Sequence, residues 1–214
     1  MKNPSVILAD DHRVFLEGLL GLLQAEGFAV AGTATNGRDA LELVQRLRPD
    51  VAVLDLAMPE LNGNEVARQL SDSGSPTRVV MLSMLATREH VMRAMRAGAM
   101  AYVPKECAGA DLAAAIRAVA SGRRYLSAAL GFTLPAGTAR EGSSPLEALS
   151  QREREIMQLV VEGHTSAKIA ETLGLSKKTV ETYRCRLMRK LGVHNVPELV
   201  KYAIQTGVTP LAIA

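Results

Sequence analysis

The chain has 214 residues, of which 48% are hydrophobic and only 3% aromatic, so we expect cores of Leu, Val, Ile, Met and Ala. A membrane span needs roughly eighteen consecutive apolar residues, and no run in the sequence reaches that length. The formal net charge is only +3, and residues 1–8 lack the pattern of an export signal, so we expect none.

The excess positive charge lies in the C-terminal third of the chain. Residues 146–214 carry ten Lys and Arg against seven Asp and Glu, whereas residues 1–125 carry fourteen of each. This asymmetry indicates an anionic partner for residues 146–214.

The first 122 residues alternate between short apolar runs and longer amphipathic stretches. The apolar runs predict strands at 6–9, 28–32, 51–54, 79–82 and 100–103. The amphipathic stretches predict helices at about 12–26, 37–47, 63–71, 87–97 and 109–121. Unbroken apolar strands are typical of a parallel sheet covered on both faces. Five such units in order predict an α/β flavodoxin-like (βα)5 fold, a doubly wound parallel sheet.

Carboxylates follow two of the predicted strands. Asp10 and Asp11 come directly after the first strand, and Asp55 ends the third. In a flavodoxin-like strand order these strands are neighbours at the switch point, where ligands bind beyond the carboxyl ends. Because adjacent carboxylates repel one another unless a cation lies between them, we expect a hard divalent cation such as Mg²⁺.

A hydroxyl and an ammonium group complete the predicted pocket. Ser83 ends the fourth strand, and Lys105 follows the fifth. Three carboxylates, a hydroxyl and a Lys suit phosphoryl transfer onto an Asp, since metal and Lys neutralise the phosphoryl oxygens. Taken singly, Asp10 and Asp11 are more simply explained as helix caps and Lys105 as a solvated loop residue. The coincidence of all five at strand ends favours a site.

Residues 125–147 interrupt the regular pattern. Gly131, Pro135, Gly137, Gly142 and Pro145 break any helix or strand. We therefore expect a linker here, followed by a second domain at 148–214.

The second domain is predicted to contain only helices. Ser150 and Glu153 form a capping box for the first helix, which Gly163 ends. Thr165 caps a short second helix that stops at Gly174, Ser176 caps a third that runs to about residue 191, and a fourth follows from about residue 196. The turn between the second and third helices predicts a helix-turn-helix within a small all-α four-helix domain.

The third helix has one apolar and one basic face. Val180, Tyr183, Leu187 and Leu191 recur at spacings of three and four and predict the buried stripe, although Tyr183 could also donate to a phosphate. A basic helix of this kind fits the major groove of DNA. The residues predicted to face bases are Lys178, Glu181, Thr182 and Cys185. The residues predicted to hold phosphates are Lys177, Thr179, Arg184 and Arg186. The alternative is an ordinary solvated basic face.

The cysteines point to a reducing compartment. Cys107 and Cys185 stand 78 positions apart, outside any metal-ligand spacing. We therefore expect a cytoplasmic protein with reduced thiols. For Cys185, a plain helix position is a simpler interpretation than a redox role.

The whole chain resembles two-component response regulators of the NarL/FixJ type. Asp10-Asp11-His12 is similar to the family's acidic pair, and Leu54 to Pro59 followed by Asn62-Gly63 is similar to its phosphoacceptor loop. Leu82-Ser83 and Lys105 match the switch hydroxyl and the lysine. The resemblance implies a receiver domain at 1–124 with a flavodoxin-like fold.

The resemblance also assigns roles to individual residues of that domain. It implies that Asp55 is phosphorylated by a histidine kinase or a small acyl phosphate. It implies that Asp10, Asp11 and the Ala57 carbonyl hold Mg²⁺ together with Asp55. Tyr102 matches an aromatic switch residue, and its alternative is a half-buried core position.

Residues 149–193 resemble the LuxR-type helix-turn-helix. The matching positions include Glu153, Gly163, Leu173, Ser176 and Val180. The resemblance implies a transcription regulator that binds a two-fold site in double-stranded DNA as a homodimer when phosphorylated. It implies that the last helix, at about 196–206, pairs two copies, whereas simple packing on its own domain is the alternative. No catalytic activity is implied beyond the protein's own phosphorylation and dephosphorylation.

Three other functions remain open from the sequence. The first is a DNA-binding protein that ignores phosphorylation, which the intact pocket disfavours. The second is an acid-metal phosphohydrolase, but Ala57 stands where its general acid would be. The third is an RNA-binding antiterminator, which would show little preference for duplex DNA.

Overall fold

The computed structural model describes residues 3–133 and 145–209. The chain divides into two compact units, Met1–Ala139 and Arg140–Ala214, and each unit is described by itself. Residues 134–144 of the predicted linker, and residues 210–214 at the end of the predicted second domain, lie outside the described residues. Among the helices described, none is both long and apolar enough to cross a membrane.

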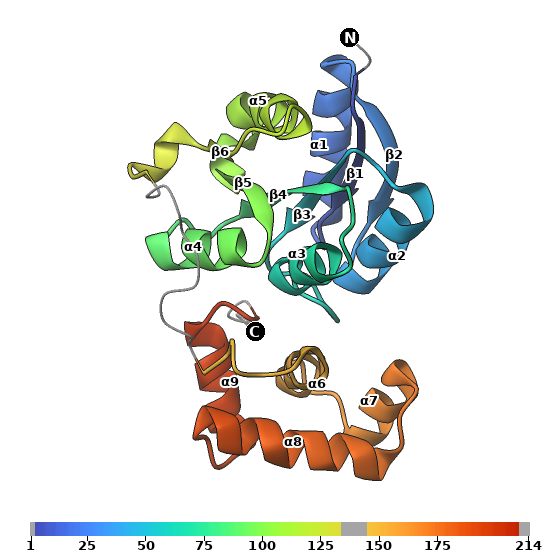
Figure 1. The fold of residues 1–214 in the computed structure, drawn as a ribbon, viewed down its shortest axis with the longest axis vertical. Coiled ribbons are helices and arrows are strands. Elements are labelled where there is room, and N and C mark those ends of the chain that lie inside the picture. Colours follow the sequence, from blue (N-terminus) through green and yellow to red (C-terminus); the bar gives the residue numbers. More distant parts are fainter. Residues whose placement is uncertain (1–2, 134–144, 210–214) are drawn as a thin grey trace. The chain divides into compact units, whose positions relative to one another are not determined.

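The first unit is built on a six-stranded parallel sheet with the order β2-β1-β3-β4-β5-β6 (Figure 1). This arrangement confirms the predicted doubly wound, flavodoxin-like sheet, with one short strand added at its edge. The strands are β1 (Ser5–Ala9), β2 (Ala29–Ala34), β3 (Val51–Asp55), β4 (Arg78–Ser83), β5 (Ala99–Pro104) and β6 (Tyr125–Leu126).

Helices cover both faces of this sheet (Figure 1). The helices α1 (Arg13–Ala25) and α5 (Ala108–Ala120) lie on one face, and α2 (Gly37–Leu47), α3 (Gly63–Asp72) and α4 (Arg88–Arg96) lie on the other. Side chains alternate along β1, so Val6 and Leu8 pack under α1 and α5 while Ile7 joins the opposite core. Burial on both faces explains why β1, β3, β4 and β5 are almost wholly apolar, whereas the outer strand β2 is partly exposed.

The segment after α5 is ordered against the sheet. Residues 125–130 fall in the predicted linker, but they form β6 and the short 3-10 helix η2 (Ala128–Leu130). The backbone N–H of Ser127 donates to the Tyr102 carbonyl at 3.1 Å, and the buried Ser127 hydroxyl donates to the Asp111 carboxylate of α5. Leu130 is buried in the core on the α4 side. Residues 125–130 are thus part of the first unit and lie along the edge of β5.

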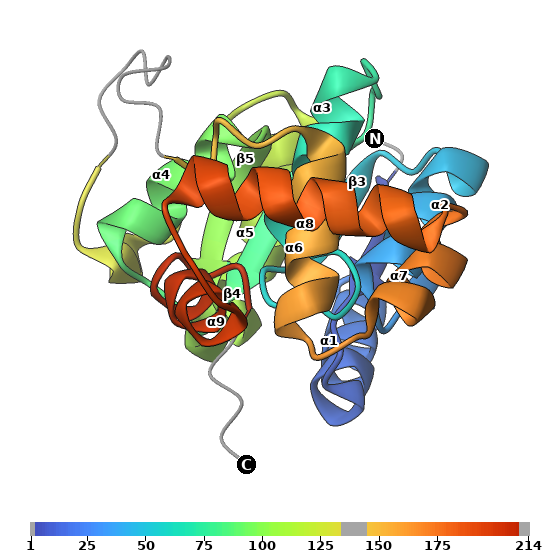
Figure 2. The same cartoon turned by 90° about the horizontal axis from the view of Figure 1, so that it is seen from below.

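The second unit consists of four described helices around one core. They are α6 (Gln151–Val161), α7 (Ser166–Leu173), α8 (Lys177–Leu191) and α9 (Val196–Gln205). Figure 2 shows α8 crossing α6 with α7 beside it, and both contacts bury apolar side chains. Val180, Leu187 and Leu191 of α8 are buried as predicted, and Tyr183 is half-buried.

Local sequence fixes where these helices begin. Ser150 and Glu153 form the predicted capping box of α6, and Glu153 is also paired with Lys190 of α8 at 2.6 Å. Burial would raise the pKa of Glu153, but hydrogen bonds from Lys190 and Ser150 outweigh it and hold the pKa below its ordinary value. Thr165 and Ser176 cap α7 and α8 through their hydroxyls.

Candidate functional site

Four strands bring polar side chains to one edge of the sheet. Asp10 directly follows β1 and Asp55 ends the neighbouring strand β3, and the two lie side by side because the residues that precede them are in register. Ser83 ends β4, and Lys105 directly follows β5. All four residues are buried. The strand ends therefore place Asp10, Asp55, Ser83 and Lys105 on one side of the sheet.

Lys105 links two of the carboxylates. Its Nζ atom lies 2.7 Å from Oδ2 of Asp10 and 3.1 Å from Oδ2 of Asp55. The same ammonium group lies over the ring of Phe15, 5.0 Å from the ring centre. A cation over an aromatic face is attracted by the ring's electrons, so Phe15 helps to hold Lys105 in place. Lys105 is thus a buried, fixed charge, and the alternative of a solvated loop residue is excluded.

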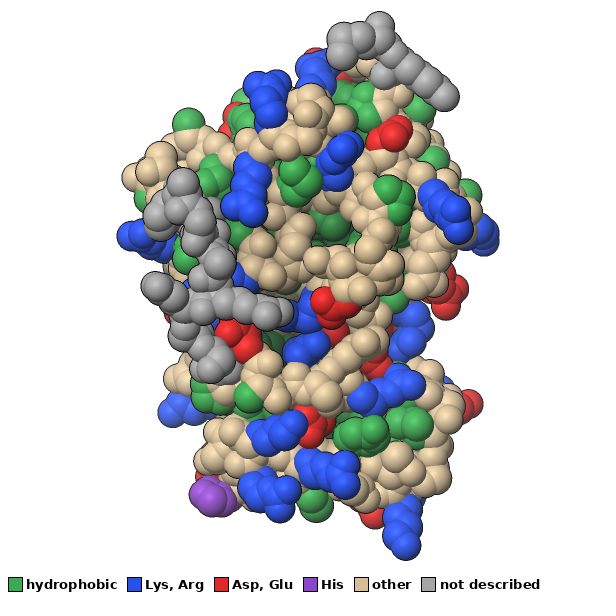
Figure 3. All heavy atoms as spheres, viewed as in Figure 1, with side chains coloured by type: hydrophobic (Ala, Val, Ile, Leu, Met, Phe, Trp, Pro, Cys, Tyr) green, Lys and Arg blue, Asp and Glu red, His purple; other side chains and the backbone are tan. Residues whose placement is uncertain are grey.

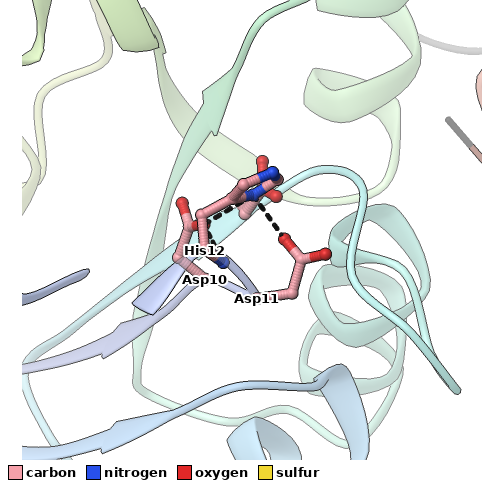
Figure 4. Close-up of side chains that lie close together, drawn as sticks. Asp10, Asp11 and His12 are labelled. Atoms are coloured by element: carbon pink, nitrogen blue, oxygen red, sulfur yellow. Dashed lines mark hydrogen bonds and ion pairs between the residues drawn. The ribbon is translucent and has the colours of Figure 1, made fainter. Parts of the chain in front are cut away.

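Asp11 and His12 complete the cluster at the surface (Figure 4). Asp11 is partly exposed, and the exposed imidazole of His12 places Nδ1 2.8 Å from Oδ1 of Asp11 and 3.4 Å from Oδ1 of Asp10. One potential ligand atom from each of Asp10, Asp11, His12 and Asp55 lies within 4.8 Å of the others. Three carboxylates against one ammonium group leave an excess of negative charge, which fits a divalent cation.

The carboxyl group of Asp55 is difficult to ionise in this setting. Burial raises its pKa to about 6 from the ordinary 3.8, the charge of Lys105 opposes this rise, and Asp10 adds to it. A carboxylate that is destabilised by its surroundings gains from any cation that relieves the repulsion.

This raised pKa gives the unfolding free energy a pH dependence. The folded chain binds a proton at Asp55 more tightly than the unfolded chain, so without divalent cations its stability should fall as the pH rises from about 4 to about 6. Asp55→Asn should remove this loss and stabilise the chain at pH 7, by up to roughly 3 kcal/mol. Urea unfolding across this pH range in a chelator tests the expectation. Asp72→Asn, at an exposed position on α3, is the matched control, and equal slopes in all three proteins would contradict it.

Ser83 and Tyr102 are connected through the loop after β4. The backbone N–H of Leu85 donates to Oγ of Ser83 at 2.9 Å, and the Tyr102 hydroxyl donates to the backbone carbonyl of Leu85. Tyr102 is fully buried rather than half-buried. Burial raises the pKa of Tyr102 to about 12. A hydrogen bond with Ser83 opposes this rise, and the charge of Asp55 adds to it. The phenol is therefore a neutral donor that ties β5 to this loop.

The loop after β3 is held by its own hydrogen bonds. The N–H of Leu56 donates to the Leu82 carbonyl at 2.9 Å, and the N–H of Gly63 returns to the Leu56 carbonyl at 3.0 Å. Ala57, the predicted backbone ligand, lies in this loop and is partly exposed. Its role as a ligand stays a prediction.

A second candidate surface lies on α8, at the exposed side of the helix-turn-helix. Lys178, Glu181, Thr182 and Cys185 form one exposed stripe at spacings of three and four, which are the positions predicted to face bases. Lys177 and Arg186 are exposed beside it. Figure 3 shows several Lys and Arg side chains gathered on one face of this unit. The stripe is therefore available to a partner without any rearrangement of the core.

Two of the predicted phosphate ligands already have partners within the unit. Thr179 shares a hydrogen bond of 2.8 Å with the Ser176 hydroxyl, and Arg184 donates to Oγ of Ser166 in α7 at 2.7 Å. Both residues are half-buried. Arg184 thus fixes α8 against α7, a role that helical spacing alone did not indicate.

The sequence does not indicate the contacts made by two neighbours of the acidic cluster. Phe15 lies in the first turn of α1 and its position indicates only packing, so nothing in the sequence marks it as the ring beneath Lys105. His12 was recognised only as part of a motif, although a histidine that directly follows two carboxylates is a usable signal for a cation site.

Both units match known protein families. Residues 6–117 match the response regulator receiver domain, and residues 147–203 match the bacterial regulatory proteins of the luxR family. The chain is 36% identical over 204 residues to the transcriptional regulatory protein MctR of Rhizobium johnstonii, covering 95% of this chain and 94% of that protein. It is 34% identical over 206 residues to the response regulator UvrY of Escherichia coli, with the same coverage.

Solved structures resemble the chain in the same way. The signal receiver domain of NarL from Mycobacterium tuberculosis is 34% identical with a TM-score of 0.56, covering 57% of this chain and all of that one. The response regulator RcsB in its complex with DNA is 25% identical with a TM-score of 0.57, covering 96% of this chain and 99% of that one.

Proposed function

The chain belongs to the response regulators that carry a receiver domain and a LuxR-type DNA-binding domain, and on that premise we propose that phosphorylation of Asp55 controls its binding to DNA. The observation that carries the proposal is the buried Lys105, whose ammonium group contacts both Asp10 and Asp55. A fixed cation beside a carboxylate nucleophile is what phosphoryl transfer requires, because charge on the phosphoryl oxygens must be neutralised.

The proposed transfer begins with Oδ of Asp55 attacking phosphorus. The donor is a phosphohistidine of a sensor kinase or a small acyl phosphate. A P–O bond to Asp55 forms as the bond from phosphorus to the donor breaks, and the donor leaves with the electron pair. Lys105 neutralises one phosphoryl oxygen and the Ser83 hydroxyl donates a hydrogen bond to another. Water later attacks phosphorus, releases inorganic phosphate and returns the Asp55 carboxylate, so the proposed chemistry is only the protein's own phosphorylation and dephosphorylation.

A bound Mg²⁺ would neutralise negative charge on the phosphoryl group and the carboxylates. Asp10, Asp11 and Asp55 would hold it, together with the backbone carbonyl of Ala57. The convergence of these carboxylates supports that assignment.

The proposed switch runs from Ser83 to Tyr102. When Ser83 turns toward the phosphoryl group, it gives up its hydrogen bond from the Leu85 N–H. The carbonyl of Leu85 accepts the hydrogen bond from the Tyr102 hydroxyl, so a change at Leu85 reaches Tyr102. A local change of charge would then bias the arrangement of the loop, of Tyr102 and of α4. We expect the altered receiver domain, residues 1–124, to promote formation of a homodimer in the cytoplasm. In this dimer α9 would pair the two DNA-binding domains at 148–214, which would then bind a two-fold DNA site.

In this proposal α8 lies in the major groove. Lys178, Glu181, Thr182 and Cys185 would face base edges, while Lys177 and Arg186 would contact phosphates, with Thr179 and Arg184 beside them. Base contacts specify the sequence, whereas phosphate contacts position the protein.

Lys177→Ala should weaken binding to all duplexes by a similar factor. Because one phosphate contact is lost, the slope of log affinity against log salt should fall by about one. Fluorescence anisotropy with two unrelated duplexes at several salt concentrations measures both effects. Arg46→Ala, which removes one exposed positive charge from α2, is the control for net charge. A variant that loses affinity for only one duplex would place Lys177 at a base instead.

The experiment that tests the proposed function is selection of bound DNA from a random duplex pool, with and without acetyl phosphate. We expect one two-fold sequence to be enriched, and more strongly with acetyl phosphate. Enrichment that is identical in both arms would contradict control by phosphorylation. An absence of any preferred duplex would contradict sequence-specific DNA binding.

A further inference from the structure

His12 occupies a helix-cap position without capping the helix. It is the N-cap residue of α1, with φ −86° and ψ 93°, yet its side chain makes no cap hydrogen bond. Asn, Ser and Thr cap most other helices of the described chain through their side chains, which is the usual use of this position. The imidazole is instead turned toward the carboxylates of Asp10 and Asp11 (Figure 4).

The position of the imidazole nitrogen matches the spacing of atoms that share one cation. Ligand atoms bonded to a metal at about 2.1 Å, and at right angles to one another, lie about 3 Å apart. Nδ1 of His12 lies 2.8 Å from Oδ1 of Asp11 and 3.4 Å from Oδ1 of Asp10. The two groups contact different oxygens of Asp10, since His12 lies near Oδ1 and Lys105 near Oδ2.

We propose that Nδ1 of His12 is a ligand of the cation site, so that this site binds a transition-metal dication of the Mn²⁺ to Zn²⁺ series more tightly than carboxylates alone would. The inference rests on the proposed cation site at Asp10, Asp11 and Asp55. Mg²⁺ prefers oxygen ligands and retains its waters, whereas imidazole suits Ni²⁺, Zn²⁺ and similar ions. The nitrogen therefore increases the preference for such ions over Mg²⁺ beyond that of a site with oxygen ligands alone.

The surroundings of His12 leave this role open to it. Its side chain is 71% exposed, so the imidazole can turn without disturbing the core. It lies beside the buried carboxylate of Asp10 and the partly exposed carboxylate of Asp11. The competing explanation is a simple ion pair, in which a protonated His12 donates to Asp11. A ligand must be unprotonated at Nδ1 and would contribute affinity that depends on the identity of the metal. An ion pair would not distinguish metals in this way.

Calorimetric titration of the untagged full chain with Ni²⁺ and with Mg²⁺ at neutral pH tests the proposal. We expect His12→Asn to lose about tenfold or more in Ni²⁺ affinity. The same variant should bind Mg²⁺ within about twofold of the parent chain. His194→Asn removes a histidine from the second unit and controls for nickel binding at other histidines. Asp11→Asn should weaken both metals, because it removes a carboxylate from the site itself.

The other outcomes of this titration would contradict either the ligand role of His12 or the cation site itself. Equal Ni²⁺ affinity in His12→Asn and the parent chain would overturn the ligand role. An equal loss of Ni²⁺ and Mg²⁺ affinity would also overturn it, since His12 would then act only by orienting Asp11. If Asp11→Asn changed neither metal, the proposed cation site itself would be wrong, and that failure is separate from the failure of His12.

Discussion

Asp55→Asn is expected to reduce labelling of the chain by acetyl phosphate from readily detectable to none. An amide oxygen is a poor nucleophile and cannot form the acyl phosphate, while the shape of the side chain is nearly kept. Lys105 keeps its contact of 2.7 Å with Asp10, so the pocket should survive the substitution. Mass spectrometry of the intact chain after incubation with acetyl phosphate and Mg²⁺ measures the labelled fraction.

The control for this result is Asp72→Asn, which changes an exposed carboxylate on α3. It should be labelled like the parent chain. Asp55→Asn should also lose any gain in DNA affinity that acetyl phosphate produces. Labelling of Asp55→Asn at the parent rate would show that another residue accepts the phosphoryl group.

Gly63→Ala is expected to damage both stability and phosphorylation. A Cβ atom at this position would lie 2.3 Å from the carbonyl oxygen of Asp55 and 2.9 Å from Sδ of Met81. Backbone atoms cannot move aside as a flexible side chain can, so either α3 or the end of β3 must shift. Overpacking of this kind costs about 1–3 kcal/mol. Because the displaced residue is the proposed phosphoacceptor, labelling should also slow by about tenfold or more.

Urea unfolding followed by circular dichroism, with labelling measured on the same samples, tests this expectation. Gly18→Ala is the matched control, since the space around its Cβ is empty for 4 Å and its helical position favours Ala by up to about 1 kcal/mol. Gly18→Ala should therefore be neutral or stabilising. If Gly63→Ala were as stable and as reactive as Gly18→Ala, the tight approach at β3 would not exist.

The candidate pocket could be predicted because topology alone brings strand ends together. Asp10, Asp55, Ser83 and Lys105 each follow or end an apolar run, and parallel strands present those ends at one edge of the sheet. No side-chain geometry was needed for this step. The alternation of short apolar runs with longer amphipathic stretches was enough to place each of the first five strands within a few residues.

Side-chain contacts within the pocket could not be predicted in the same way. The ring of Phe15 beneath Lys105 and the orientation of His12 depend on rotamers chosen by tertiary packing. Strand β6 was also missed, because two residues carry no periodic pattern. It forms because β5 offers an unpaired edge and Ser127 is anchored by Asp111.

The exposed stripe of α8 followed from helical spacing, since the buried positions Val180 and Leu187 fix which side faces outward. The hydrogen bond between Arg184 and Ser166 did not follow, because the sequence does not give the distance between α7 and α8. The partners of long polar side chains such as Arg184, which lie between the buried and exposed sides of α8, were therefore the least predictable part of this surface.

The most direct test of control by phosphorylation is the ratio of two dissociation constants for one duplex recovered by selection. Both are measured on the full chain at fixed salt, before and after phosphorylation by acetyl phosphate, because affinity for DNA depends strongly on salt. We expect the phosphorylated chain to bind at least about tenfold more tightly, as a coupling of roughly 1.4 kcal/mol requires. A ratio of one, with Asp55 shown to be phosphorylated in the same sample, would contradict the proposed switch.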